Sequence, residues 1–542
     1  MYGYFHSLFK RRGKNDPTIQ DLPWLSTPSI WLYIRKYIDP STGRLKPEGE
    51  KLPDDVRRTA DIKMRWAAGA LDGVFGHHAG ANHDPNQAKK ISSLVLKIAR
   101  SDHSDREKIE LYTLLLRDDL LTYIDLVVNE VLHSKIELRP RLQNFTAFLL
   151  HEAPDRGPVK FAISLSGILQ NEDEIETIAI LGRHEEFTLY SAVALSNIMK
   201  DPEMQLWNMA KTVSGWGRIH LVERLSRTQK PQIKNWLLRD GYKNSIMYEY
   251  LAYPCAVGGD LRAALEKPEI DAPLLKSGGE IIEALINGGP AQDIDDYDDA
   301  PAVLINYLRH LSRHASRLEH FLWAHVIYRY LVEGLTDPIE RNEKGWDSNL
   351  YENALLVANQ ILSLPAWARQ VREDLNSPDQ SRFYLADRVA QVLGIDTWDQ
   401  HWKLLQADPL SSRLWFYVMR NITPDHAGQA VQMAMEVLDL SEITSEMLDE
   451  SRFGIKHPHF ACLDIILQGL NDFPGLGWPL VAAGLKSHLV SNRNKAIQVL
   501  GRWGRANWTD EMYQTLVDAY QAEPMEKVKE LIQKVLQDGA SA

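Results

Sequence analysis

Between Met204 and Cys255, apolar residues recur at intervals of three and four positions, and they do not alternate with polar residues as in a strand. The pattern predicts three short helices in series. The first begins at Met204, the second carries Ile219, Val222 and Leu225 on one face, and the third begins at Pro231. Helices this short are marginal alone, so each needs the next one stacked against its apolar face.

The same periodicity extends from residue 87 to about residue 200, with short connections that contain Asp, Gly, Pro or Asn. Helices of about ten to fourteen residues joined by links of about two to eight are typical of stacked helical hairpins. The length of 542 residues is several times that of a typical domain, which fits an extended array. The helices predicted in this part are Ile91–Ile98, Lys108–Leu116, Leu120–Leu132, Leu142–Leu150, Val159–Leu169, Ile175–Leu181 and Phe187–Met199.

Sequence repetition is weak. The segment NRNKAIQVLGRWG, residues 492–504, is echoed by EKVKELIQKVL, residues 526–536, about one helical hairpin later. Degenerate repeats of this kind resemble the HEAT and armadillo class of helical repeat proteins. We therefore predict an all-α fold of the α–α superhelix type.

The chain is divided into three parts by composition. Residues 1–86 are rich in proline and form an N-terminal extension and cap, residues 87–290 form a helical repeat region, and residues 291–542 form a second one. The boundary rests on two Gly-Gly pairs and a run of aspartates between residues 277 and 301. After it, Ala302–Leu335 is predicted to be the longest helix.

Five aspartates follow the second Gly-Gly pair. Calcium accepts such oxygen ligands, but the central Gly and terminal Glu of a helix–loop–helix calcium site are missing. We favour an acidic lead-in to the next helix, where negative charge is favourable with the helix dipole. The residues are Asp293, Asp295, Asp296, Asp298 and Asp299.

Composition narrows the function classes. A formal net charge of -12 and a pI near 5.9 argue against nucleic acid as a partner, because affinity for phosphate needs dense positive charge. The cysteines are Cys255 and Cys462 alone, so neither a disulfide framework nor a thiolate metal cage is expected, and a cytoplasmic location is favoured. The sequence shows no secretory signal and no membrane span.

A Gly- and His-rich loop brings His77, His78, His83 and Asp84 close together. Zinc and iron accept such nitrogen and oxygen donors, so these residues are the candidate metal ligands. Their spacing differs from the i, i+4 pairs by which helices present metal ligands. We favour the alternative, in which they cap a helix and make loop hydrogen bonds.

A second candidate site lies on the long predicted helix. His310 and His314 are one turn apart, beside Arg309, Arg313 and Arg317. These residues are candidates for binding an anionic ligand. In the alternative that we favour, the upstream aspartates neutralise them, because this needs no external ligand.

The motif GWGRIHLVER supplies the candidate partner-binding residues Trp216, Arg218, His220 and Arg224. Aromatic and arginine side chains anchor many protein interfaces. The chain has 15 tryptophans, however, and in long helical proteins most tryptophans belong to the core. Both interpretations stay open for these residues, and we favour the core.

Two segments, RWAAGALDGVFGHHAG (residues 65–80) and GWGRIHLVERL (residues 215–225), resemble a family of bacterial all-helical proteins labelled limonene hydroxylase. The resemblance implies an oxidoreductase that hydroxylates a monoterpene such as limonene. The residues themselves show no phosphate loop, no dinucleotide fingerprint and no haem-thiolate motif, so no cofactor is expected from them.

The residue patterns and the resemblance leave three functions to consider. We predict a non-catalytic helical-repeat scaffold that engages a protein partner through a concave surface. The alternatives are the hydroxylase implied by the resemblance and a HEAT-like DNA-repair glycosylase. The sequence assigns no catalytic residue and no oligomeric state.

Overall fold

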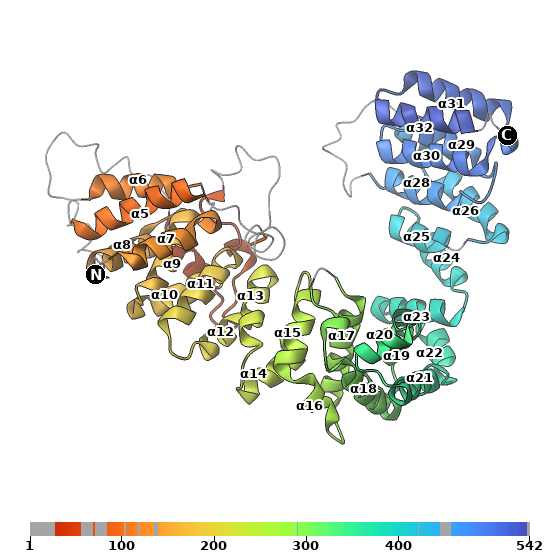
Figure 1. The fold of residues 1–542 in the computed structure, drawn as a ribbon. Coiled ribbons are helices and arrows are strands. Elements are labelled where there is room, and N and C mark those ends of the chain that lie inside the picture. The colour runs from red at the N-terminus through yellow and green to blue at the C-terminus, as the bar shows by residue number, and fades with distance from the viewer. Residues whose placement is uncertain are drawn as a thin grey trace. The chain divides into compact units, whose positions relative to one another are not determined.

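The described part of the chain is helical (Figure 1). Between the described residues, the only β-type pairing is an isolated bridge of Ile38 with Leu45, so the predicted all-α fold is confirmed there. The chain forms two compact units, Met1–Ser363 and Leu364–Ala542. The computed structural model describes residues 28–55, 69–70, 84–101, 104–117, 120–134, 139–289, 291–420, 422–444 and 457–538.

In the first unit, each helix of a row packs on the helix that lies two positions further along the chain. The row α9–α11–α13–α15–α17–α19–α21 runs through the unit in this way, and α10 and α12 pack on its flank against α11 and α13. Packing in which each helical repeat contacts the next repeat along the chain is the arrangement of a superhelical array. The helices are α2 (Ile30–Tyr37), α5 (Pro85–Arg100), α6 (Asp105–Leu115), α7 (Ile124–His133), α8 (Arg139–Glu152), α9 (Arg156–Ile168), α10 (Ile175–Leu181), α11 (Glu185–Ile198), α12 (Glu203–Ala210), α13 (Gly215–Leu225), α14 (Pro231–Trp236), α15 (Glu249–Gly259), α16 (Leu261–Glu266), α17 (Ala272–Asn287), α18 (Ala300–His314), α19 (Leu318–Arg329), α20 (Pro338–Glu343) and α21 (Ser348–Leu362).

The second unit repeats this arrangement. Its helices α25, α28, α30 and α32 pack in one row, and α27, α29 and α31 pack in another. A continuous apolar core joins them, with Trp415, Leu463, Leu480 and Leu500 fully buried. The helices are α22 (Ala366–Asp374), α23 (Gln380–Leu393), α24 (Trp398–Ala407), α25 (Ser412–Arg420), α26 (Pro424–Val437), α27 (Leu440–Thr444), α28 (Pro458–Gly469), α29 (Trp478–Leu485), α30 (Val490–Trp503), α31 (Asp510–Ala522) and α32 (Glu526–Asp538).

The prediction of one long helix from Ala302 to Leu335 is wrong. The chain leaves the helix at Ala315, whose ψ of 112° is extended, and α19 starts at Leu318. The Nδ1 atom of His320 accepts a hydrogen bond from the backbone N–H of Ser316 at 3.2 Å, which satisfies a donor at the start of α19. The two helices then pack on each other.

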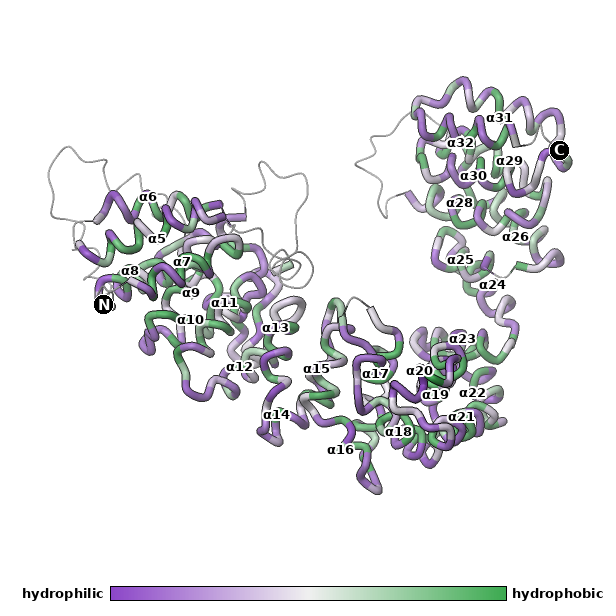
Figure 2. Tube along the Cα trace, viewed as in Figure 1, coloured by the Kyte–Doolittle hydropathy of each residue, from purple (hydrophilic) through white to green (hydrophobic). Residues whose placement is uncertain are grey.

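Most described helices carry both apolar and polar residues along their length (Figure 2). Among these helices, none is long and apolar enough to cross a membrane. Cys255 and Cys462 are buried and free, and they lie in different units. The boundary expected after residue 290 falls inside the first unit, where α17 and α18 pack on each other.

Candidate functional site

The predicted partner-binding residues of α13 lie in the interior of the first unit. Trp216 is 3% exposed, and its ring lies 5.5 Å from that of Tyr250. Arg218 is also buried, and its guanidinium donates hydrogen bonds to the carbonyl oxygens of Ala210 (2.9 Å) and Asp240 (2.6 Å). These side chains therefore join α13 to its neighbours, as the core interpretation expected.

The other two residues of this group also make internal contacts. His220 is buried, with Nδ1 3.9 Å from a carboxylate oxygen of Glu223, and Arg224 donates to the carbonyl oxygen of His220 at 2.8 Å. The glycines of the motif have a packing role. A Cβ atom on Gly217 would lie 2.6 Å from Thr188 Oγ1, so glycine lets α13 approach α11 closely.

The basic residues predicted to bind an anion face the end of α16. Arg309 Nη2 donates to the carbonyl oxygen of Leu265 at 3.0 Å, and His310 Nε2 lies 2.9 Å from the same oxygen. Arg313 Nη1 donates to the carbonyl oxygen of Pro268 at 3.1 Å. Cations stabilise a helix C-terminus, where carbonyl groups lack partners within the helix. These three side chains therefore hold α16 against α18.

The remaining basic residues pair with glutamates. His314 Nε2 lies 3.6 Å from Glu269, and Arg317 lies 2.9 Å from Glu319. The internal partners that we favoured are thus present, but they are not the aspartates. Asp299, for example, pairs with Arg262 at 2.8 Å.

Of the candidate metal ligands, the structure describes Asp84 alone. His77, His78 and His83 lie outside the described residues. Asp84 caps the N-terminus of α5, where its Oδ1 accepts hydrogen bonds from the backbone N–H groups of Asn86 (3.1 Å) and Gln87 (3.0 Å). Within the described ranges, no group of three or more His, Cys, Asp or Glu residues is arranged to hold a metal ion.

A buried network of charges in the first unit was not predicted. Arg156 forms ion pairs with Asp54 (2.9 Å), Asp55 and Glu186 (3.4 Å), and Lys160 Nζ lies 2.6 Å from Glu186 Oε1. Burial raises the pKa of Glu186, but the positive charges of Lys160 and Arg156 outweigh it and lower the pKa to about 2. The network connects Asp54 and Asp55, which precede α5, to helices α9 and α11.

A partly exposed aromatic–arginine surface lies on α23 and α25 of the second unit. We define it by Tyr384, Arg413, Phe416, Tyr417 and Arg420. The guanidinium of Arg413 lies 3.9 Å from the ring centroid of Tyr384, and that of Arg420 lies 5.3 Å from the centroid of Tyr417. The rings of Tyr384 and Tyr417 are 5.4 Å apart, and Phe416 is 45% exposed. Cation–π contacts of this kind restrain flexible arginine side chains.

A buried hydrogen-bonded group supports this surface. Asp387 is 1% exposed, and its Oδ1 lies 2.8 Å from both His401 Nε2 and Thr397 Oγ1. The His401 ring stacks on Tyr417, with centroids 4.6 Å apart and planes 4° apart, and Arg420 lies 3.5 Å from Asp387. Burial raises the pKa of Asp387, but the hydrogen bonds from His401 and Thr397 outweigh it, so the pKa lies below its usual value.

One arginine of this surface, Arg413, has no ion-pair partner among the described residues. Arg413 is exposed, and none of the carboxylates that the structure describes forms an ion pair with it. The sequence signal for this surface is SSRLWFYVMR, in which Arg413, Phe416, Tyr417 and Arg420 recur at intervals of three and four positions. No role was predicted for this segment from the sequence.

No protein-family model, no curated protein and no solved structure matches this chain. The resemblance to the limonene hydroxylase family therefore stays a prediction. The same holds for the hydroxylase and DNA-glycosylase functions.

Proposed function

We propose that the protein is a non-catalytic helical-repeat scaffold that binds a protein partner. The observation that carries the proposal is the aromatic–arginine surface on α23 and α25. Tyrosine, phenylalanine and arginine are enriched at the centres of protein interfaces, where a few such residues supply most of the binding free energy. Phe416 stands exposed between the restrained arginines, as an anchor residue does.

The charge of the surface indicates the chemistry of the partner. Arg413 has its positive charge available, while the positive charge of Arg420 is partly balanced by Asp387 at 3.5 Å. An acidic segment of the partner that carries an apolar side chain would pair with Arg413 and cover Phe416. Such electrostatic complementarity favours the correct partner and accelerates association.

The test compares capture of proteins from a lysate of the native host by immobilised wild type and variants. We expect one protein to be retained by the wild type and released by Arg413→Glu and by Phe416→Ser. Loss of an interface anchor costs ~2 kcal/mol, which weakens binding about 30-fold. The matched control is Lys403→Glu, which reverses an exposed charge on α24 and leaves the surface intact.

Two results would contradict the proposal. Equal capture by wild type and Arg413→Glu would show that partners bind elsewhere. Binding that disappears after nuclease treatment would assign the surface to single-stranded nucleic acid, which aromatic and arginine side chains also stack against. The net charge of -12 disfavours that second outcome.

A further inference from the structure

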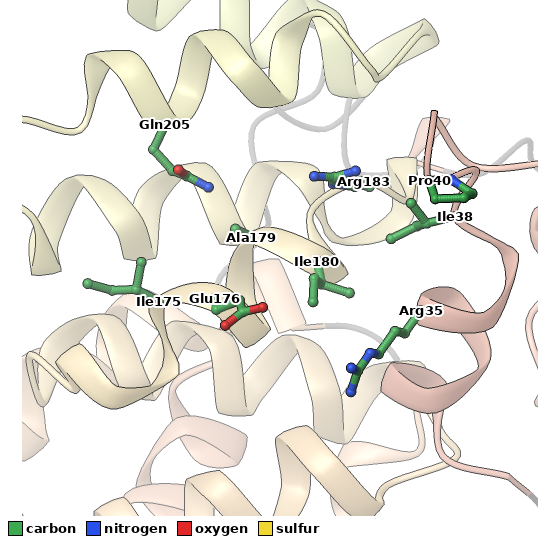
Figure 3. A pocket seen from close by; sticks show the side chains of 9 residues that line it. All are labelled: Arg35, Ile38, Pro40, Ile175, Glu176, Ala179, Ile180, Arg183 and Gln205. Atoms are coloured by element: carbon green, nitrogen blue, oxygen red, sulfur yellow. The ribbon is translucent and has the colours of Figure 1, made fainter. Parts of the chain in front are cut away.

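A pocket of about 460 Å³ lies in the first unit between α2, α10 and α12 (Figure 3). Its size falls within the range of natural ligand sites. Ile175, Ala179 and Ile180 of α10 form its apolar floor. Ile175 and Ile180 are half-buried, so an apolar group laid on them would remove more of their surface from water.

One end of the pocket is basic. Figure 3 shows Arg35 and Arg183 at this end, on either side of Ile180. Arg183 Nη1 donates to the carbonyl oxygen of Gly43 at 2.6 Å, which fixes the guanidinium, and burial lowers the pKa of Arg183. Arg35 is exposed on the last turn of α2, with its guanidinium 5.2 Å from the ring centroid of Trp31.

Neither arginine forms an ion pair with a carboxylate among the residues that the structure describes. Arg183 is fixed and partly desolvated, and Arg35 lies across Ile180 from it. A carboxylate at this end would lie near both positive charges, and a guanidinium group donates charge-assisted hydrogen bonds to a carboxylate.

The opposite end of the pocket is polar. The side-chain amide of Gln205 and the carboxylate of Glu176 lie on either side of Ala179 there, and Ile175 lies farther along (Figure 3). An aliphatic tail extending from the basic end would pass between Gln205 and Glu176 without offering a hydrogen bond to either side chain. A peptide backbone would offer an amide group to Gln205 and an N–H group to Glu176.

We propose that this pocket binds the C-terminus of a protein or peptide whose last residue is aliphatic. The terminal carboxylate lies between Arg35 and Arg183, the last side chain covers Ala179 and Ile180, and the preceding backbone reaches Gln205 and Glu176. This site belongs to the first unit and does not depend on the aromatic–arginine surface.

The experiment measures fluorescence anisotropy of the full-length protein with a labelled pool of hexapeptides that are random except for a C-terminal leucine. We expect binding of the pool with free carboxylates, and at least tenfold weaker binding of the same pool with C-terminal amides. Arg35→Glu and Arg35→Ala are expected to weaken binding at least tenfold. Arg35 is exposed, so neither substitution removes a buried contact.

The matched control is Lys36→Glu. Lys36 is the next residue in the same last turn of α2, is equally exposed and does not line the pocket. We expect its binding to stay within twofold of wild type.

The proposal is overturned by no binding of the pool at 1 mM protein, by equal binding of acid and amide pools, or by unchanged binding in Arg35→Glu. Displacement of the pool by decanoate at equal concentration would assign the pocket to a free aliphatic acid instead.

Discussion

Both units bury a charged group, but they use it differently. In the first unit, Arg156 is surrounded by Asp54, Asp55 and Glu186, and all four side chains are largely buried. In the second unit, Asp387 is also buried, but one of its partners, Arg420, belongs to the partly exposed aromatic–arginine surface. The first network joins segments about a hundred residues apart, and the second holds a surface in place.

Burial of a charge therefore does not by itself indicate a functional site. A buried charge is costly unless it is paired, and both groups meet that requirement. What separates them is the environment of their partners. The described carboxylate partners of Arg156 are at most 16% exposed, whereas His401 and Arg420 connect the buried Asp387 to the half-buried ring of Tyr417.

The largest effect is expected from Arg156→Met. The substitution keeps an apolar side chain of similar length but leaves Asp54, Asp55 and Glu186 buried without their shared cation. Breaking a buried pair in this way costs ~3–5 kcal/mol. Urea unfolding of the full chain measures it, as a shift of the transition of the first unit.

The control for this prediction is Arg413→Met in the second unit. Arg413 is exposed, so the free energy of unfolding is expected to change by less than ~0.5 kcal/mol. A loss below ~1 kcal/mol in Arg156→Met would mean that water or rearrangement replaces the arginine, and the contrast between the units would fail.

An intermediate effect is expected from Asp387→Asn. The amide keeps the size of the carboxylate but removes the charge that His401, Thr397 and Arg420 contact. Hydrogen bonds to a charged group contribute ~1.5–3 kcal/mol, and we expect a loss of about that size in the unfolding of the second unit. Circular dichroism during urea unfolding measures it.

Asp399→Asn is the matched control, because Asp399 is exposed on the neighbouring helix and is expected to cost less than ~0.5 kcal/mol. The comparison also predicts weaker partner binding by Asp387→Asn, since Tyr417 and Arg420 lose their support. Unchanged stability and unchanged binding together would show that the surface is organised without Asp387.

The helical class of the fold was predictable because apolar spacing reports it directly. The break between α18 and α19 was not, because Leu311, Ala315, Leu318 and Leu322 continue the helical spacing across it. In the sequence, the apolar residues of the two helices form one continuous series at helical spacing. A spacing pattern alone therefore does not distinguish one long helix from two packed ones.

The candidate site was harder to predict. In α25, Leu414, Trp415 and Val418 are buried, while Phe416 and Tyr417 lie on the adjacent, partly exposed face. Both sets recur at helical spacing, so the sequence does not tell which face meets solvent. In α13, Trp216 and Arg218 were open to both interpretations in the sequence, and the structure places them in the interior.

The smallest effect concerns two adjacent glutamates in the first unit. Burial raises the pKa of Glu185 from 4.5 to about 7, against the hydrogen bond from Ser214. Glu186, paired with Lys160 and Arg156, has its pKa lowered to about 2. The two neighbours should therefore give pH dependences of opposite sign.

The sign follows from linkage between protonation and folding. The folded state keeps the proton of Glu185 more tightly than the unfolded state does, so its contribution to stability is complete below pH 4.5 and is lost as pH rises towards about 7. Glu186 behaves oppositely, with a contribution present above pH 4.5 and lost as pH falls towards 2.

In Glu185→Gln, the loss of stability between pH 4.5 and 7 should disappear, while the loss below pH 4.5 should stay. Thermal unfolding from pH 3 to 8 measures this effect. The difference in Tm between wild type and Glu185→Gln should change by about 1–3 °C across that range. Parallel curves for wild type and Glu185→Gln across that window would show that Glu185 is solvated like an ordinary surface carboxylate, and the first unit would then hold its buried charges only as ion pairs.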